Sequence, residues 1–369
     1  MIEALSLYFL MSKLKDLINK LCPNGVEFKR LSEITKMSAG DRVTKAEMSK
    51  DALYPVMGGG VVETGKYHVW NRENCVTISR AGSAGSVGWH SEKFWATDVC
   101  FTAEEKDKNI AIIKYVYYVI EAQEYELKRH LYGGTLPKLD KSFLWGLPIP
   151  VPPLPVQEEI VRILDKFTEY NACLARELEL RKKQYSYYRD KLLTFGDEVP
   201  RVRLADVAVT LSSGKNKERN KDGAFPVYGS TGIIARTNTP VYDYQQILIA
   251  RVGSCGYVQI ADGQYDVTDN TLILDVKKEY SLKYFYYLLQ SMRLNQYAKG
   301  GAQPLITGGE LKKLEVPIPP LETQEKIVKI LDKFESLCND LVHGLPAEIE
   351  ARRKQYEFYR DKLLNFESI

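Results

Sequence analysis

The sequence predicts an α+β fold in which two α/β domains are separated by two long antiparallel coiled-coil helices, with an internal pseudo-twofold repeat. Three observations support this prediction. The chain contains one unit written twice. Each copy ends in a long segment whose apolar residues alternate at coiled-coil spacing. The remainder of each copy holds short β-type runs, glycine-rich loops and a tyrosine-rich helix.

The repeat is clearest in the long helices. PLPVQEEIVRILDKF (153–167) returns as PLETQEKIVKILDKF (320–334), and KQYSYYRDKLLTF (183–195) returns as KQYEFYRDKLLNF (354–366). The upstream parts match more weakly, as in ISRAGSAGSV (78–87) against IARVGSCGYV (249–258). A plain duplication predicts uniform drift, so nearly identical helices indicate one shared docking role and divergent domains indicate two different ligands.

Residues 1–24 are expected to form an N-terminal extension and a helix stub. An amphipathic helix is predicted from Met11. Its end, 15–21, is expected to stand where the end of the first long helix stands before the second domain, so that the unit is circularly permuted relative to the chain ends. Residues 1–10 are apolar, but they lack the basic flank of a signal peptide and are shorter than the roughly 20 residues of a membrane span. We expect no membrane association.

Residues 25–152 and 198–319 are predicted to be the two α/β domains. Strands are expected at 76–79, 247–250 and 271–274, and tyrosine-rich helices over 110–131 and 282–297. The tyrosines of these helices are more typical of core packing than of base stacking. They are Tyr115, Tyr117, Tyr118, Tyr284, Tyr286 and Tyr287.

Residues 153–197 and 320–369 are predicted to form the two long helices. A helix from about residue 156 to 195 would be ~60 Å long at ~1.5 Å per residue. One helix cannot bury a one-sided apolar seam, so the two are expected to pair antiparallel and to place the domains at opposite ends. Asn171 and Arg181 interrupt the first seam and would set its register, whereas Gly344 and Pro346 should break or kink the second helix. The residues expected to pair the helices are Ile160, Leu164, Phe167, Leu174, Leu178, Tyr185, Tyr188, Leu192, Ile327, Leu331, Phe334, Ile349, Tyr356, Tyr359 and Leu363.

Composition excludes few partners but several kinds of site. The net charge of +3 does not identify a nucleic-acid binder, because a small total can hide a strongly basic face. The six cysteines form no Cys-x-x-Cys pair, and the four histidines have no metal-ligand spacing. We expect reduced thiols, a cytoplasmic location, no metal and no cofactor.

No catalytic motif stands out in the sequence. A glycine-rich strand-turn-helix for a methyl donor and an Asn-Pro-Pro-aromatic motif for a flipped base are both missing. The glycine clusters at 58–60, 82–85, 253–256 and 308–309 open no amphipathic helix after a buried strand, so tight turns explain them better. Glu-x-Lys triplets such as residues 126–128 arise by chance in charged helices.

The duplicated Arg-x-Gly-Ser-x-Gly loop is the strongest candidate for ligand contact. Each copy follows a predicted strand and is rich in glycine, which lets the backbone approach a ligand closely. Arginine can grip guanine or a phosphate oxygen, and serine can contact either base or phosphate. The residues are Arg80, Ser83, Arg251 and Ser254. The alternative is a structural turn whose arginines pair with the equally duplicated Asp98 and Asp269.

Two further pairs of segments are candidates for DNA contact. One pair is a basic loop early in each domain, with Arg42, Lys45 and Lys50 in the first and Lys215, Lys217, Arg219 and Lys221 in the second. The other pair is GGTLPKL (133–139) and GGAQPLI (300–306), which present Thr135, Lys138 and Gln303. Solvated loops are an equally plausible explanation of both. For the basic triplets 181–183 and 352–354, contact with DNA and a solvated helix face are equally open.

The succession of variable domain, proline-rich hinge and Gln-Glu-x-Ile-Val helix, repeated once, resembles the specificity subunits of type I restriction-modification systems. The resemblance covers residues 13–366 and rests chiefly on the two PLxxQExIVxILDKF segments and their YYRDKLL and FYRDKLL endings. It implies two target-recognition domains, each reading one half of a split, asymmetric sequence in double-stranded DNA, with the helices as a ruler. It also implies two methyltransferase (modification) subunits docked on the helices, restriction/motor subunits, and no catalytic activity in this chain.

Two alternatives come from other classes of protein. A coiled-coil scaffold with protein-binding globular ends would use the same helices without DNA. A self-sufficient DNA-modifying enzyme would need the methyl-donor or nuclease motifs that the sequence lacks.

Overall fold

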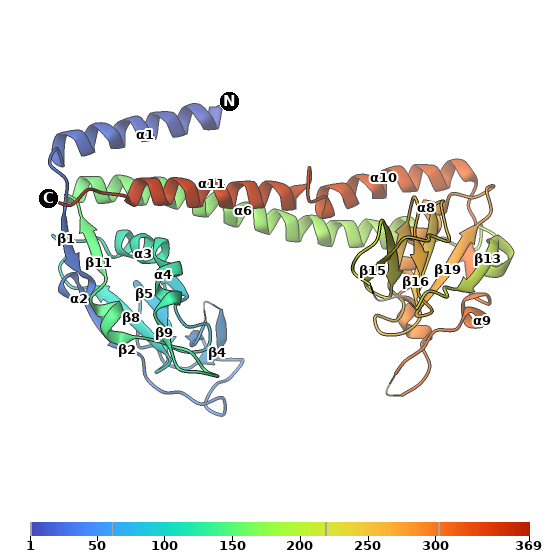
Figure 1. Cartoon of the computed structure of the whole chain (residues 1–369), viewed down its shortest axis with the longest axis horizontal. Helices are drawn as coiled ribbons and strands as arrows, with labels where there is room; N and C mark the ends of the chain where they lie inside the picture. The colour runs from blue at the N-terminus through green and yellow to red at the C-terminus, as the bar shows by residue number, and fades with distance from the viewer. Residues whose placement is uncertain (1, 61, 218–219, 302) are drawn as a thin grey trace. The chain divides into compact units, whose positions relative to one another are not determined.

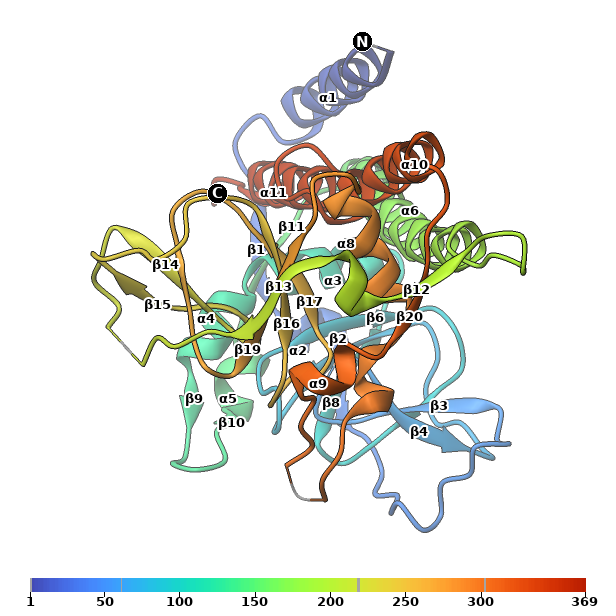
Figure 2. The same ribbon diagram turned by 90° about the vertical axis from the view of Figure 1, so that its right-hand side faces the viewer.

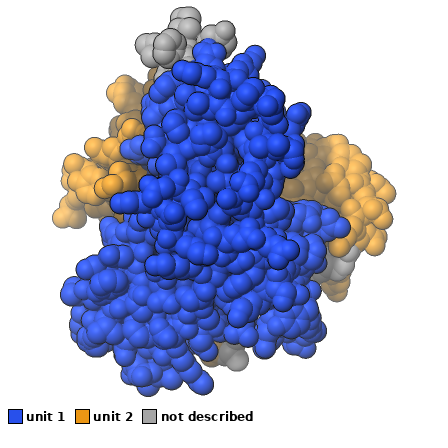
Figure 3. Space-filling model, turned by 90° about the vertical axis from the view of Figure 1, so that its left-hand side faces the viewer, with its two compact units in different colours: residues 1–174, 349–369 blue, residues 175–348 orange. Residues whose placement is uncertain are grey.

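The computed structural model describes residues 2–60, 62–217, 220–301 and 303–369, with side chains described from residue 11 onward. The chain divides into two compact units (Figure 3). Unit 1 comprises residues 1–174 and 349–369, and unit 2 comprises residues 175–348. The long helix α6 (Leu154–Leu192) belongs in part to each unit.

Unit 1 is built around a four-stranded antiparallel sheet with the strand order β2-β8-β5-β6. Helix α3 packs against β5 and β6 (Figure 1). A second sheet, β4-β3-β7, and two pairs, β1-β11 and β9-β10, complete the strands. The elements are α1 (Ile2–Leu21), β1 (Glu27–Arg30), α2 (Leu31–Ile34), β2 (Thr35–Ala39), β3 (Tyr54–Met57), β4 (Glu63–Tyr67), β5 (Cys75–Ser79), β6 (Val87–His90), β7 (Trp95–Ala96), β8 (Cys100–Glu105), α3 (Ile113–Ala122), α4 (Glu124–Arg129), β9 (Leu131–Tyr132), β10 (Lys138–Leu139), α5 (Lys141–Trp145) and β11 (Pro148–Val151).

Unit 2 repeats this topology. Its central sheet has the order β13-β19-β16-β17, its second sheet is β15-β14-β18, and β12 pairs with β20. Helix α8 packs against β16 and β17 (Figure 2). The elements are β12 (Arg201–Arg203), α7 (Leu204–Val207), β13 (Ala208–Ser213), β14 (Phe225–Gly229), β15 (Gly232–Thr237), β16 (Gln246–Ala250), β17 (Val258–Ala261), β18 (Asp266–Val267), β19 (Thr271–Val276), α8 (Leu282–Ser291), the 3-10 helix η1 (Leu294–Tyr297), α9 (Gly308–Leu311), β20 (Glu315–Pro317) and α10 (Leu321–Asn339), followed by α11 (Leu345–Leu364), which lies mostly in unit 1.

The mixed α and β fold, the duplicated domain and the long helix between the two copies are therefore confirmed. The strands predicted at 76–79, 247–250 and 271–274 are β5, β16 and β19, each extended by one or two residues at one end. β5 and β16 are buried along their whole length, as expected for central strands that read as continuous apolar runs.

Each predicted tyrosine helix is wrong in its length. The first is two helices, α3 and α4, which meet at Gln123. The second is α8 followed by η1, with Arg293 at a positive φ of 47° between them. In both copies the bend turns a leucine, Leu127 or Leu294, fully into the core. Burial of these side chains outweighs the continuation of a straight helix.

The predicted N-terminal helix starts too late. The structure extends it from Met11 back to Ile2, and residues 2–10 contain no glycine or proline that would stop a helix. The prediction that the end of α1 takes, in unit 1, the position that the end of α6 has in unit 2 is also wrong. The end of α11 has that position, because Leu364 packs in the core of unit 1 as Leu193 packs in the core of unit 2. Helix α1 is thus an addition to the repeated unit.

Helix α6 lies antiparallel to a partner helix in each unit. In unit 1 the ring of Phe167 stacks on Tyr359 at 5.5 Å, and Arg352 lies over Tyr170. In unit 2 the ring of Tyr188 stacks on Phe334 at 5.8 Å. Among the other residues predicted to pair the helices, seven are buried and four are partly buried. The buried residues are Ile160, Leu164, Leu174, Ile327, Leu331, Tyr356 and Leu363, and the partly buried ones are Leu178, Tyr185, Leu192 and Ile349.

The predicted break in the second long helix is present. Helix α10 ends at Asn339 and α11 begins at Leu345. A Cβ atom on Gly344 would lie 2.6 Å from the carbonyl oxygen of Ser336, so only glycine fits this close approach. Pro346 stands in the first turn of α11, where a missing N–H breaks no helical hydrogen bond.

Each domain is fastened to its own long helix by the same set of polar contacts. In unit 1 the amide oxygen of Gln157 accepts a hydrogen bond from Ile112 N (2.9 Å), and Tyr118 donates to Asp165 (2.5 Å). In unit 2 Gln324 accepts from Ser281 N (3.0 Å), and Tyr287 donates to Asp332 (2.6 Å). Burial raises the pKa of both tyrosine hydroxyls, so they stay protonated donors.

These contacts change the interpretation of the repeat. The glutamine and aspartate of the Gln-Glu…Asp-Lys-Phe segments serve the junction between domain and helix inside each unit. Part of the identity of the two helices therefore has an internal cause and does not need an external partner. The prediction that the tyrosines pack in the core is confirmed, since Tyr115, Tyr118, Tyr284 and Tyr287 are buried.

Replacing Gln324 with leucine is expected to lower the free energy of unfolding by about 1–3 kcal/mol, because the partly buried Ser281 N and the buried Pro319 O lose their partner. Urea unfolding of the purified chain measures the loss. Glu325→Leu changes the next, exposed residue and is the matched control. Equal unfolding midpoints for the two variants would show that the amide does not hold the junction.

Candidate nucleic-acid interface

The candidate loops of unit 1 meet at one end of the strands of its central sheet. Because the sheet is antiparallel, the ends of β2 and β5 and the starts of β8 and β6 lie at the same edge. Arg42 follows β2, and Arg80 and Ser83 follow β5. The β9–β10 hairpin joins them through Leu139 N, which donates to Arg80 O at 2.9 Å. We call this edge, with residues 40–50, 80–86, 97–99 and 133–138, the loop edge of unit 1.

Unit 2 has the equivalent loop edge, with residues 214–217, 251–257, 268–270 and 299–305, Ala302 excepted. Lys215 and Lys217 follow β13, and Arg251 and Ser254 follow β16. Ile306 N donates to Arg251 O at 3.0 Å, the counterpart of the contact in unit 1. The hairpin is closed here by a bridge between Lys299 and Leu305. The fold thus gathers three predicted segments at one edge in each unit.

Most of the candidate side chains on these edges are exposed. Arg42, Lys45, Ser83, Thr135 and Lys138 are exposed in unit 1, and Lys215, Lys217, Ser254 and Gln303 are exposed in unit 2. Arg219 lies outside the described residues. In each unit the loop edge is on the far side of the sheet from the unit's own long helix, as Figures 1 and 2 show for the β9–β10 hairpin. A ligand can therefore reach the edge without displacing the helices.

The two arginines of the duplicated loops are held in place without an ion pair. Arg80 lies over the ring of Phe101, 5.7 Å from its centroid. Arg251 donates from Nη1 to Ser213 Oγ at 3.2 Å and toward Asp269 O at 3.5 Å. Within residues 2–60, 62–217, 220–301 and 303–369, neither guanidinium forms an ion pair with Asp98 or Asp269. The alternative of a structural ion pair is therefore wrong, and both positive charges remain available.

Glycine shapes these loops in two ways. Gly82 and Gly253 have φ values of +81° and +73°, which residues with a side chain rarely adopt. A Cβ atom on Gly256 would lie 2.4 Å from Asn295 N, so this glycine allows the loop to pack against η1. The prediction of tight turns is confirmed for the clusters at 82–85 and 253–256, and it is wrong for Gly308 and Gly309, which begin the helix α9.

A further loop and one aromatic ring join the loop edges and were missed from the sequence. Ser83 N donates to Gly59 O at 2.6 Å, and a Cβ on Gly253 would lie 3.2 Å from Ser230 Oγ. The loops between the strands of the second sheet thus lie beside the Arg-x-Gly-Ser loops in both units. Tyr257 is half exposed next to Ser254. The parallel positions of Gly58-Gly59 and Gly229-Ser230 in the repeat are the signal that could have indicated these loops.

The basic triplets of the long helices lie elsewhere. Arg181 bonds to Glu177 and Gln184 on its own helix, and Arg353 bonds to Glu350 and Glu357. Charged neighbours on the same helix face are typical of a solvated surface. We therefore do not assign these triplets to the candidate interface.

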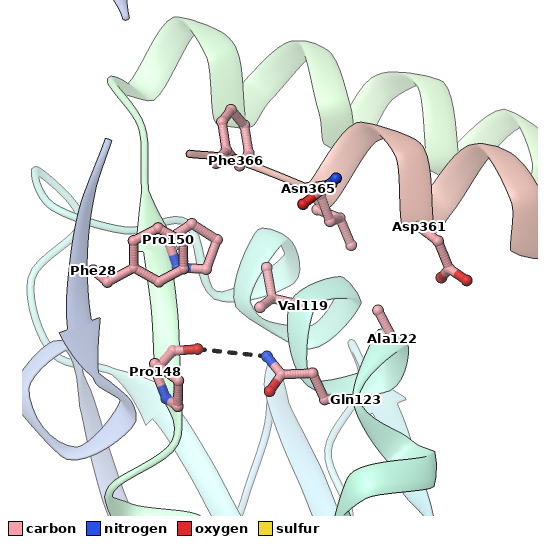
Figure 4. Close-up of a pocket in the computed structure, with 10 residues that line it drawn as sticks. Phe28, Val119, Ala122, Gln123, Pro148, Pro150, Asp361, Asn365 and Phe366 are labelled. Atoms are coloured by element: carbon pink, nitrogen blue, oxygen red, sulfur yellow. Dashed lines mark hydrogen bonds between the residues drawn. The ribbon is translucent and has the colours of Figure 1, made fainter. Parts of the chain in front are cut away.

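A hollow of about 550 Å³ lies where the end of α11 meets β1, β11 and α3 of unit 1 (Figure 4). Apolar side chains such as Phe28, Val119 and Pro150 line it, and Gln123 donates to Pro148 O at 3.4 Å across it. This hollow belongs to the junction of domain and helices and not to the loop edge.

The titratable groups buried near the central sheet of unit 1 are neutral at physiological pH. Burial raises the pKa of the Cys75 and Cys100 thiols to about 12 and lowers that of His90 to about 4. The positive charge of the loop edge therefore comes from its arginines and lysines. In the part of the chain that the structure describes, no three His, Cys, Asp or Glu side chains are grouped so that they could hold a metal ion. No helix among the described residues is long and apolar enough to cross a membrane.

A family model described as the type I restriction modification DNA specificity domain matches residues 23–180 and again residues 197–351. The chain belongs to this type I DNA specificity family. A putative type I restriction enzyme specificity subunit of Haemophilus influenzae is 31% identical to it, over 92% of this chain and 96% of the relative. A specificity subunit of Escherichia coli is 34% identical, over 70% of this chain and 72% of the relative.

Solved structures support the same fold for this specificity protein. The S subunit of the type I restriction-modification system of M. genitalium has a TM-score of 0.65 and 20% identity, covering 93% of this chain and 97% of that one. A chain from a study of complex assembly in a type I system has a TM-score of 0.57 and 15% identity, covering 93% and 98%. The family match and the relatives of 31% and 34% identity show a specificity protein that recognises DNA sequence. The predicted family is confirmed.

Proposed function

We propose that the two domains, residues 25–152 and 198–319, each read one half of a split, asymmetric sequence in double-stranded DNA through their loop edges. The observation that supports this most directly is that both units have the loop edge. The backbone contacts are the same in the two units, but the exposed side chains differ. Leu139 N to Arg80 O and Ile306 N to Arg251 O are equivalent contacts, whereas the hairpins present Thr135 and Lys138 in one unit and Gln303 in the other. Two loop edges with the same backbone and different side chains are suited to bind DNA in the same way while reading two different half-sites.

The constant and the variable side chains take different roles in this proposal. Arg80, Ser83, Arg251 and Ser254 grip guanine edges or phosphate oxygens in both half-sites. Arg42, Lys45, Lys215 and Lys217 contact phosphates, and Thr135, Lys138 and Gln303 contribute to the difference between the two readings. The helices 153–197 and 320–369 set the distance between the half-sites. Two methyltransferase subunits dock on these helices and restriction/motor subunits join them.

Arg80→Ala and Arg251→Ala are each expected to weaken binding to the target duplex by about 1–3 kcal/mol, because a guanidinium that grips a base edge or a phosphate is lost. The measurement is a titration of the target duplex with the chain and its co-expressed methyltransferase. Arg353→Ala removes an arginine that is already paired on α11 and is the control. Unchanged binding with a lowered melting temperature would assign Arg80 and Arg251 a structural role only.

A further inference from the structure

An exposed aliphatic side chain stands at the hairpin of the second sheet in both units. Val62 directly precedes β4 and is 72% exposed, and Ile233 lies near the start of β15 and is 57% exposed. The two occupy the same position of the repeat, as counting on from the match of residues 54–56 with residues 225–227 shows. A single exposed apolar residue is ordinary. The same type of residue at the same position of two divergent domains indicates a shared role.

The tips of these hairpins lie against the Arg-x-Gly-Ser loops. In unit 2 a Cβ atom on Gly253 would lie 3.2 Å from Ser230 Oγ. In unit 1 Ser83 N donates to Gly59 O at 2.6 Å. In each unit the contact is made by the hairpin shortly before its aliphatic residue. Both aliphatic side chains therefore belong to the loop edges, although neither was among the residues predicted to contact DNA.

The chemistry of these two side chains differs from that of the rest of the loop edges. The exposed neighbours, such as Lys215, Lys217 and Ser254, can bind phosphate oxygens or the polar groups of base edges. Valine and isoleucine carry no hydrogen-bonding group in the side chain, so they cannot recognise either of these. In the major groove the base edges present one apolar group, the C5 methyl of thymine. That methyl is the feature of a duplex that suits an exposed aliphatic residue.

We propose that Val62 and Ile233 each contact the methyl group of a thymine in the major groove, one in each half-site. This inference rests on the proposed function, because it needs the loop edges to bind DNA. It assigns the reading of an A·T pair to the hairpins of the second sheets, beside the guanine or phosphate contacts of Arg80 and Arg251. Each half-site consequently contains at least one thymine, on either strand, whose methyl group contributes to binding.

The probe is the target duplex in which one thymine at a time is replaced by deoxyuridine, which lacks only the methyl group. It is titrated with the chain and its co-expressed methyltransferase. We expect deoxyuridine at one position of the half-site read by unit 2 to weaken binding about four-fold, because the burial of about one methyl group is lost. Ile233→Ser is expected to weaken binding of the thymine duplex and to bind both duplexes equally. Ile233→Val keeps an aliphatic side chain and should keep the preference for thymine.

Two further variants serve as matched comparisons. Val62→Ser should abolish the preference for thymine in the other half-site and leave the preference of unit 2 unchanged. Val209→Ser removes a side chain that is 60% exposed near the start of β13, whereas the loop edge follows the end of that strand. It should leave both preferences unchanged. Circular dichroism checks that the variants are folded.

Several results would overturn the proposal. They are a half-site without thymine, deoxyuridine duplexes that all bind as tightly as the thymine duplex, and a preference for thymine that both serine variants retain. Weaker binding of Ile233→Ser without any preference for thymine in the parent chain would instead indicate an apolar wedge between base steps. Arg80→Ala and Arg251→Ala, titrated in parallel, separate the two proposals. If they weaken binding while no methyl group matters, the loop edges bind DNA and only the inference on Val62 and Ile233 fails.

Discussion

Replacing residues 200–315 with the matching segment of a related specificity protein is expected to change one half of the methylated DNA sequence and to leave the other half unchanged. The physical reason is that the domain of unit 2 has its own hydrophobic core and its own loop edge. Each mismatched base pair costs about 1–3 kcal/mol, so the original half-site would lose methylation almost completely. Sequencing of methylated bases in cells that express the chimera with its methyltransferase measures the outcome.

The contacts between the domain and its long helix decide which residues the replacement segment must keep. The donor segment must keep Tyr284 and Tyr287, because they bond to Pro317 O and Asp332 of the retained chain. The reciprocal replacement of residues 27–147 is the matched experiment and should change the other half of the sequence. If both halves change in either chimera, the two domains do not read DNA independently.

Inserting four residues after Leu178 is expected to lengthen the gap between the two half-sites by one or two base pairs while both half-sites stay the same. Four residues are close to one helical turn, so they add ~6 Å and nearly preserve the facing of the seam. Duplex DNA rises ~3.4 Å per base pair. The spacing of half-sites in the methylated sequence of the insertion variant measures the change.

The break between α10 and α11 makes Leu178 a suitable position. Arg352 lies over Tyr170, and Tyr188 stacks on Phe334. Counting along the antiparallel helices from either contact places Leu178 opposite Gly344, in the irregular segment between the two helices. The variant therefore also carries four residues inserted after Val342, in that segment of the partner strand of the helix pair. With both insertions, the paired stretches on either side keep their register. An active variant with an unaltered gap would show that the helices are not the ruler.

The fold was largely predictable because its strongest signals are local or repeated. The seam of α6 is a short-range pattern, and the duplicated Gln-Glu…Asp-Lys-Phe segments stand out by simple comparison. The break near Gly344 follows from residue types that disfavour a helix interior. Errors arose where burial overrides such patterns, as at Leu127 and Leu294, whose side chains bend the predicted tyrosine helices into the core.

The candidate site was predictable only in part. Its segments are far apart in the chain, and their meeting depends on the antiparallel order β2-β8-β5-β6, which no local pattern encodes. The sequence suggested Arg80 and Arg251 because they are duplicated. Among the described residues, however, neither arginine forms the suggested ion pair with the carboxylate of Asp98 or Asp269, and Arg251 bonds instead to the backbone oxygen of Asp269. The loop at Gly59 was missed because its approach to Ser83 depends on a second sheet.

Methylation mapping of the host genome, with and without an intact copy of this chain, tests the central claim most directly. The account predicts a methylated sequence of two defined parts, separated by a fixed number of unspecified base pairs, that disappears when the chain is deleted and returns when it is restored. A methylated sequence without such a gap, or a split sequence that persists after the deletion, would contradict it.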